Sequence, residues 1–135
     1  MPLLHWDEGY SVKVRELDQQ HQHLFALINT LHEAMSSGRG KEVLGKVLQE
    51  LLEYTEYHFS NEERLFALHG YPVAGPHKAE HDKLTQQVRE LKAKFDSGQT
   101  QITVDVMLFL KNWLNHHIQV VDKKYGEFFN EHGVH

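Results

Sequence analysis

The chain of 135 residues contains no cysteine, which excludes disulfides, thiolate metal sites and cysteine nucleophiles. Long apolar runs are also missing, because charges interrupt every apolar stretch well before the roughly 18 residues that a membrane span needs. The N-terminal residues Met1 to Glu8 show no basic region followed by an apolar one. We therefore expect no signal peptide, no membrane insertion and a cytoplasmic protein.

Basic residues are in short supply, with 14 lysines and arginines against 19 acidic residues and a net charge of −5. They are scattered along the chain, so a nucleic-acid partner is not expected. Histidine is abundant instead, with twelve residues. The length fits a single domain, residues 1–135, that can bury a real core.

Four segments show the spacing of apolar residues that is typical of amphipathic helices, and short Gly, Pro and Ser clusters separate them. We predict helices over residues 18–37, 41–69, 76–96 and 103–130, after an extended arm of residues 1–17. Asp18 is expected to cap the first helix and Pro76 to open the third. Short connections make neighbouring helices antiparallel, so the predicted fold is an all-α, up-down-up-down four-helix bundle.

Histidines and carboxylates occupy positions where the apolar stripes would otherwise carry leucine or valine. Pairs four residues apart, such as His58 and Glu62 or His77 and His81, share one face of a helix. A single inward histidine is usually an ordinary core residue, but seven such donors at matched depth indicate a site. In an up-down bundle they all fall in one layer at one end: His21, His58, Glu62, His77, His81, His117 and Asp122.

Two of these residues, Glu62 and Asp122, are carboxylates, and a buried unpaired charge costs several kcal/mol or more. No lysine or arginine shares the inward faces near them, so a bound cation is the natural compensation. His117 and Asp122 are five residues apart, about 140° on an ideal α-helix. Either Asp122 reaches sideways, or the helix widens locally into a π-type turn.

Imidazoles and carboxylates suit iron, zinc, copper or nickel, while the absence of thiolates disfavours structural zinc. Seven ligands are too many for one tetrahedral ion. Two six-coordinate ions would keep a single open position after five imidazoles, two bridging carboxylates and one bridging solvent oxygen had bound. Such a centre, walled by apolar side chains, is suited to a small diatomic ligand.

Four motifs closely resemble those of the hemerythrin family in its single-domain bacterial form, and the resemblance covers nearly the whole chain. They are Asp18-Gln-Gln-His21, His58-Phe-Ser-Asn-Glu62, His77-Lys-Ala-Glu-His81 and Trp113-Leu-Asn-His-His117-Ile-Gln-Val-Val-Asp122. The resemblance implies a non-haem di-iron centre, with a bridging oxo or hydroxo group, that binds O2 reversibly. It also implies that His77, His81 and His117 hold one iron, that His21 and His58 hold the iron with the open position, and that Glu62 and Asp122 bridge.

The resulting functional expectation is oxygen transport, storage or local supply by a monomer that is not an enzyme, with an O2-consuming enzyme as recipient. An O2 or redox sensor and a di-iron enzyme acting on peroxide or nitric oxide are the alternatives. The chain lacks any Glu-x-x-His motif, which ferritin-like di-iron proteins use. A dry pocket wall is expected from Phe25, Phe59, Trp113, Leu114 and Ile118.

The remaining histidines are expected at the surface, because most of them fall off the apolar stripes: His5, His23, His32, His69, His116, His132 and His135. Glu63, next to Glu62, is expected to be a solvated charge on the helix surface. Tyr54 lies one turn before His58 and is a candidate for a hydrogen bond near the site.

Overall fold

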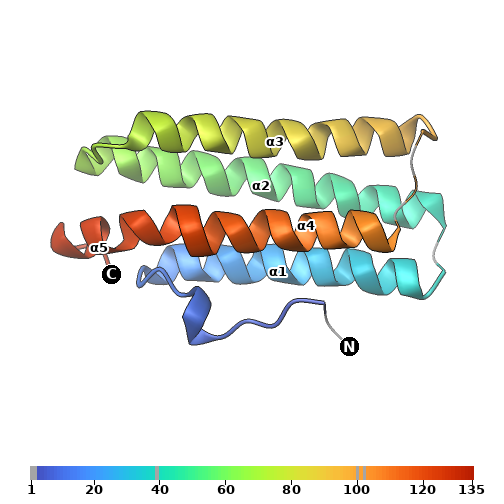
Figure 1. Ribbon diagram of the computed structural model, residues 1–135, viewed down its shortest axis with the longest axis horizontal. Helices are drawn as coiled ribbons and strands as arrows, with labels where there is room; N and C mark the ends of the chain where they lie inside the picture. The colour runs from blue at the N-terminus through green and yellow to red at the C-terminus, as the bar shows by residue number, and fades with distance from the viewer. Residues whose placement is uncertain (1–2, 39, 100, 102) are drawn as a thin grey trace.

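Four long helical stretches run up and down in an antiparallel bundle (Figure 1). The structure, a computed structural model, describes residues 3–38, 40–99, 101 and 103–135, apart from the side chains of residues 120–123. No strand occurs in these ranges, which confirms the all-α prediction. The elements are η1 (Glu8–Tyr10), α1 (Arg15–Ser36), α2 (Lys41–His69), α3 (Ala74–Asp96), α4 (Val104–His116), η2 (His117–Asp122) and α5 (Lys123–Glu131).

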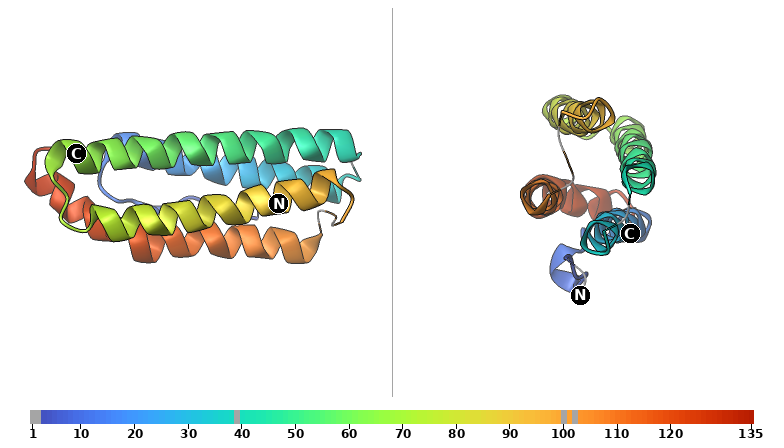
Figure 2. Two further views of the ribbon diagram at one scale, coloured as in Figure 1. Left: turned by 90° about the horizontal axis from the view of Figure 1, so that it is seen from above. Right: turned by 90° about the vertical axis from the view of Figure 1, so that its right-hand side faces the viewer.

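Helix α2 packs between α1 and α3, and α4 lies beside α1 (Figure 2). The fourth stretch of the bundle is built from α4, η2 and α5 in succession. The N-terminal arm runs outside the bundle along α1 (Figure 1). Within the described part of the chain, none of the helices has the length and apolar character to cross a membrane.

The first helix begins at Arg15 rather than at Asp18, so the prediction that Asp18 caps it is wrong. The Asp18 carboxylate instead accepts hydrogen bonds from the hydroxyl of Ser11 at 2.6 Å and from the backbone N–H of Val12 at 2.8 Å. Burial of Leu17 explains the earlier start, because its fully buried side chain stabilises the extra helical turn. Asp18 thus ties the arm to α1.

The third helix begins at Ala74, so Pro76 is its third residue. The prediction that Pro76 opens this helix is therefore wrong. The N–H groups of a first helical turn have no partner within the helix, so a proline there removes no hydrogen bond. The bounds of α2, by contrast, agree with the predicted 41–69, and Gly70 follows it in the left-handed conformation with φ of 69°.

The fourth stretch changes from α to π geometry at η2, which runs from His117 to Asp122. A π-helix joins each residue to the fifth along the chain, so these two residues lie one turn apart on the backbone. This local widening is one of the two arrangements that the five-residue spacing left open. The side chain of Asp122 lies outside the described part of the structure.

Two apolar clusters fill the bundle, and the histidine-rich layer lies between them. In α1, His21 lies between Leu17 of the smaller cluster and Leu24 of the larger one. In α2, His58 and Glu62 likewise lie between Leu51 of the larger cluster and Leu65 of the smaller one. The larger cluster continues toward the other end of the bundle and includes Ile28, Leu48, Leu51, Leu84, Val88, Met107 and Leu110. The polar layer is therefore closed by apolar side chains above and below.

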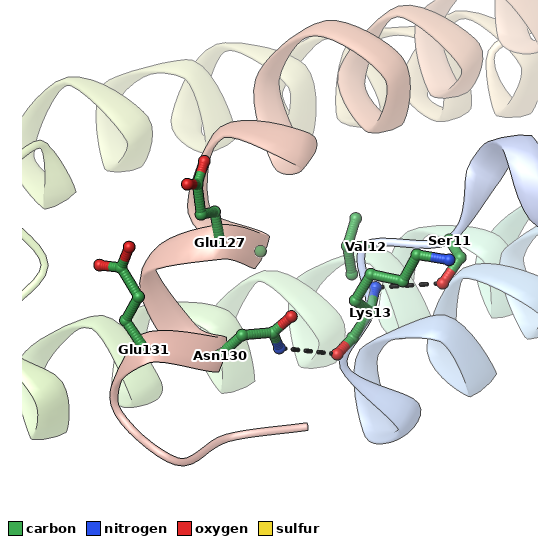
Figure 3. A pocket seen from close by; sticks show the side chains of 7 residues that line it. Ser11, Val12, Lys13, Glu127, Asn130 and Glu131 are labelled. Atoms are coloured by element: carbon green, nitrogen blue, oxygen red, sulfur yellow. Dashed lines mark hydrogen bonds between the residues drawn. The ribbon is translucent and has the colours of Figure 1, made fainter.

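The arm approaches α5 so closely that Gly126 is the residue at their contact. A Cβ atom at Gly126 would lie 2.3 Å from the backbone oxygen of Val12. Figure 3 shows the neighbouring hydrogen bond, in which the Asn130 amide donates to the backbone oxygen of Lys13 at 2.9 Å. Farther along the arm, Asn29 exchanges two hydrogen bonds of 2.8 Å with the backbone of Leu4.

The substitution Gly126→Ala is expected to release the arm from α5, because the clash is with backbone and no rotamer change relieves it. We expect a loss of about 1–3 kcal/mol in the free energy of unfolding, measured in urea, and faster proteolysis within residues 3–14. Gly45→Ala is the matched control, since its Cβ would lie nearest to side-chain atoms, the ring edge of Phe95 at 3.3 Å and Oδ1 of Asp96 at 3.9 Å. Equal stability of the two variants would contradict the close contact.

Candidate metal centre

Six of the seven predicted ligands form two clusters of three donors. His21, His58 and Glu62 come from α1 and α2, and in that cluster one ligand atom of each residue lies within 4.8 Å of the others. His77, His81 and His117 from α3 and the start of η2 satisfy the same condition. All six side chains are buried, the most accessible being His77 at 5 %. The seventh, Asp122, cannot be placed beyond its backbone position at the end of η2.

Glu62 faces both clusters. Its Oε1 atom lies 2.9 Å from Nε2 of His58, 3.5 Å from Nε2 of His81 and 3.9 Å from Nε2 of His117. One carboxylate oxygen therefore stands between imidazoles that come from three different helical elements.

The layer keeps Glu62 ionised. Burial by itself raises the pKa of this carboxyl, but the charge of His58 and hydrogen bonds from His117, His58 and His81 outweigh it and hold the pKa well below its usual range. None of the buried side chains in the described part of the chain is a lysine or an arginine. The negative charge is thus offset by imidazoles alone.

The imidazole rings cross one another around this carboxylate. Ring centroids are 4.6 Å apart for His21 and His58 and for His77 and His81, which both lie edge to face, and 5.1 Å apart for His81 and His117, whose planes are tilted by 58°. One nitrogen of each ring lies within 4.8 Å of the ligand atoms of the other residues in its cluster. Imidazole nitrogens together with a carboxylate oxygen suit a divalent or trivalent transition metal.

Two histidines of the layer have outward partners that the sequence interpretation did not include. Gln20 Oε1 lies 2.6 Å from Nδ1 of His58, and Glu63 Oε2 lies 2.9 Å from Nδ1 of His81. The prediction that Glu63 is simply a solvated charge is wrong, because its side chain is 27 % exposed and turned toward α3. Such partners fix the tautomer and orientation of a metal-binding imidazole.

The signal for these partners was available in the chain order. Gln20 precedes His21 and Glu63 follows Glu62, and adjacent helical residues point about 100° apart. A side chain next to a ligand on one helix can therefore reach the outer nitrogen of a ligand on the neighbouring helix. Recognising this requires knowing which helices are neighbours and in which direction they turn.

All five residues predicted to wall the pocket are buried, and all belong to the larger apolar cluster. Phe59 stacks flat on the ring of His81, with centroids 3.9 Å apart and planes 2° from parallel. It also lies 5.0 Å from the ring of His117 and 6.5 Å from Trp113. Phe25, Leu114 and Ile118 follow or precede a predicted ligand by one to four residues on the same helical stretch, and each is at most 3 % exposed.

The histidines that were expected at the surface lie outside the layer. His5, His23, His116, His132 and His135 are exposed, while His32 and His69 are half-buried. Tyr54 packs against the ring of His23, with centroids 4.1 Å apart. Its contact is thus with a surface histidine and not with a predicted ligand.

Comparison with known proteins shows which family carries this arrangement. The family model described as the hemerythrin HHE cation binding domain matches residues 12–129. The chain belongs to the hemerythrin family. Among curated relatives, the bacteriohemerythrin of Methylococcus capsulatus is 37 % identical over 127 residues, covering 93 % of this chain and 96 % of that protein. A hemerythrin-like protein of Naegleria gruberi is 38 % identical over 120 residues, covering 89 % and 88 %.

Solved hemerythrin structures share the fold. A crystal structure of wild-type hemerythrin superposes with a TM-score of 0.87 at 36 % sequence identity, covering 93 % of this chain and 96 % of that one. A variant hemerythrin gives a TM-score of 0.89 at 35 % identity, covering 94 % and 97 %. The four-helix bundle is thus the hemerythrin bundle. Its histidine and glutamate clusters fit the non-haem iron that this family binds.

Proposed function

We propose that this member of the hemerythrin family binds O2 reversibly at a pair of iron ions, for oxygen transport, storage or local supply. His77, His81 and His117 would hold one iron and His21 and His58 the other, with Glu62, Asp122 and an oxo or hydroxo group as bridges. The observation that carries the proposal is the Glu62 oxygen, which lies within 4 Å of imidazole nitrogens from both clusters.

Iron, when bound, supplies the reversible electron transfer that O2 binding requires. The protein side chains do the rest. Nδ1 of His58 and of His81 lies against an outward acceptor, and Nε2 points toward Glu62. Nε2 is thus the nitrogen that would bind the metal. The anionic Glu62 offsets positive charge in a buried layer, and the apolar wall excludes water from it.

Rapid mixing of the reduced, iron-loaded protein with O2 tests this function. We expect a new visible absorption that disappears when the solution is flushed with argon and returns with the next addition of O2. An absorption that argon does not reverse would contradict O2 carriage. Steady consumption of peroxide or nitric oxide by the same sample would favour a di-iron enzyme instead.

The apolar wall gives a second test, in which Leu114→Ala or Ile118→Ala is expected to shorten the lifetime of the oxygenated protein severalfold. Both side chains are fully buried and lie within three residues of His117, so their truncation admits water to the layer. The measurement is the decay of the visible absorption under air.

Leu110→Ala is the matched control for this prediction. Leu110 is equally buried but lies one turn farther from the layer on α4. Each truncation costs about 2–5 kcal/mol of stability, but only those beside His117 should change the lifetime. An equal effect of Leu110→Ala would mean that general loosening, and not water at the wall, limits the lifetime.

A further inference from the structure

The two clusters differ in the charge of the group behind one of their imidazoles. His58 and His81 both direct Nε2 toward the carboxylate of Glu62 and Nδ1 away from it. Behind His58 the partner is the neutral amide of Gln20, and behind His81 it is the carboxylate of Glu63.

Burial and neighbouring charges preserve this difference. Gln20 is 5 % exposed and lies inside the α1–α2 contact. Among the described residues, the cation paired with Glu63 is Lys78, whose Nζ atom is 3.9 Å from Oε1. That lysine is more than half exposed and lies nearer to Asp82, at 3.1 Å, so it offsets the charge of Glu63 only weakly.

An anionic acceptor on Nδ1 strengthens an imidazole as a metal ligand, because it draws the proton away from the ring and adds negative charge nearby. A more electron-rich ligand set stabilises the higher oxidation state of the ion that it holds. A neutral amide in the same place has a smaller effect.

We propose that Glu63 and Gln20 are positioning residues that add to the electronic difference between the two iron positions, which already differ by one imidazole. The ion held by His77, His81 and His117 is biased toward the oxidised state, and the ion held by His21 and His58 toward the reduced state. This asymmetry presupposes the iron pair of the proposed function. The inference goes further by stating which ion is oxidised first. It attributes that order of oxidation to Glu63 and Gln20, which are not ligands themselves.

Isosteric substitutions test the asymmetry, since Glu63→Gln removes the charge and Gln20→Glu introduces one with almost no change of shape. The readouts are iron per chain and the midpoint potential of the centre, both measured under argon without O2. We expect the potential to rise in Glu63→Gln and to fall in Gln20→Glu. A tenfold change in the ratio of oxidised to reduced protein corresponds to about 59 mV for one electron.

Glu50→Gln is the matched control, because it removes the same charge from an exposed position on α2, about 20 Å from Glu63 along the helix. It should leave the potential unchanged. The double variant Gln20→Glu with Glu63→Gln keeps the net charge but exchanges the two partners. Its half-oxidised form should give an electron paramagnetic resonance spectrum different from that of the unaltered protein. The reason is that the iron at the other position is then the oxidised one.

The outcomes separate this inference from the proposed function. Equal potentials in Glu63→Gln and Glu50→Gln, or an unaltered spectrum in the double variant, would overturn the inference even if O2 binds reversibly. Loss of iron from Glu63→Gln without a change in potential would also overturn it, since the role of Glu63 would then be structural. Shifted potentials in Glu63→Gln and Gln20→Glu, in a protein that does not release O2, would support the inference and contradict the proposed function.

Discussion

Removal of iron by a chelator is expected to lower the unfolding temperature by roughly 10–20 °C, the equivalent of about 3–5 kcal/mol for this chain length. The buried layer contains five imidazoles and the Glu62 carboxylate, and these groups lose their common partner when the metal leaves. His58 can take up a proton and pair with Glu62, 2.9 Å away, which limits the loss. The remaining imidazoles stay desolvated.

Calorimetry on the iron-loaded, chelated and reconstituted protein measures this effect. Reconstitution is the control, because the original unfolding temperature should return with the iron. Identical unfolding temperatures for the loaded and chelated forms would mean that the layer does not depend on metal. The two apolar clusters would then be sufficient to hold the bundle.

Glu62→Gln is expected to have the largest effect of any single substitution, because this residue faces both clusters. We expect binding of the iron pair to weaken more than 100-fold, beyond the roughly 10–100-fold that loss of an outer partner costs. The iron-free variant should be less stable than the iron-free parent at neutral pH, since the imidazoles around Glu62 favour the ionised carboxylate in the folded state and the neutral amide loses that attraction. Addition of iron should then no longer raise the unfolding temperature.

Glu63→Gln provides the comparison for this prediction, since it makes the same chemical change one residue along the chain. Its amide oxygen can still accept from Nδ1 of His81, so two irons per chain should remain. Iron content after desalting distinguishes the two variants. Retention of both irons by Glu62→Gln would show that this carboxylate is not the bridge.

The sequence was informative wherever a local pattern and the packing of the bundle favour the same outcome. The bounds of α2 agree because glycines stand at both of its ends, Gly40 and Gly70, while buried residues recur at helical spacing between them. The spacing of His117 and Asp122 left two arrangements open, a sideways reach of Asp122 or a π-turn, and the backbone adopts the π-turn. In both cases a geometric rule along one helix limited the possibilities.

The errors arise where a contact between segments decides the outcome. Asp18 has the residue type and position of a helix cap, but the arm offers it Ser11 and the Val12 backbone instead. The close approach of the arm to Gly126 depends on how η2 and α5 turn relative to α1. Glu63 was predicted to be solvated because its place next to Glu62 does not by itself show which helix it faces, and His81 of α3 is its actual partner. Such pairings follow from the arrangement of helices, which no single helix encodes.

Metal analysis combined with visible spectra over repeated cycles of O2 and argon measures the proposed chemistry most directly. We predict two irons per chain and an absorption that forms under O2, is lost under argon and recovers in full on the next cycle. A single zinc ion per chain, or iron whose spectrum does not respond reversibly to O2, would contradict the proposed di-iron oxygen carrier.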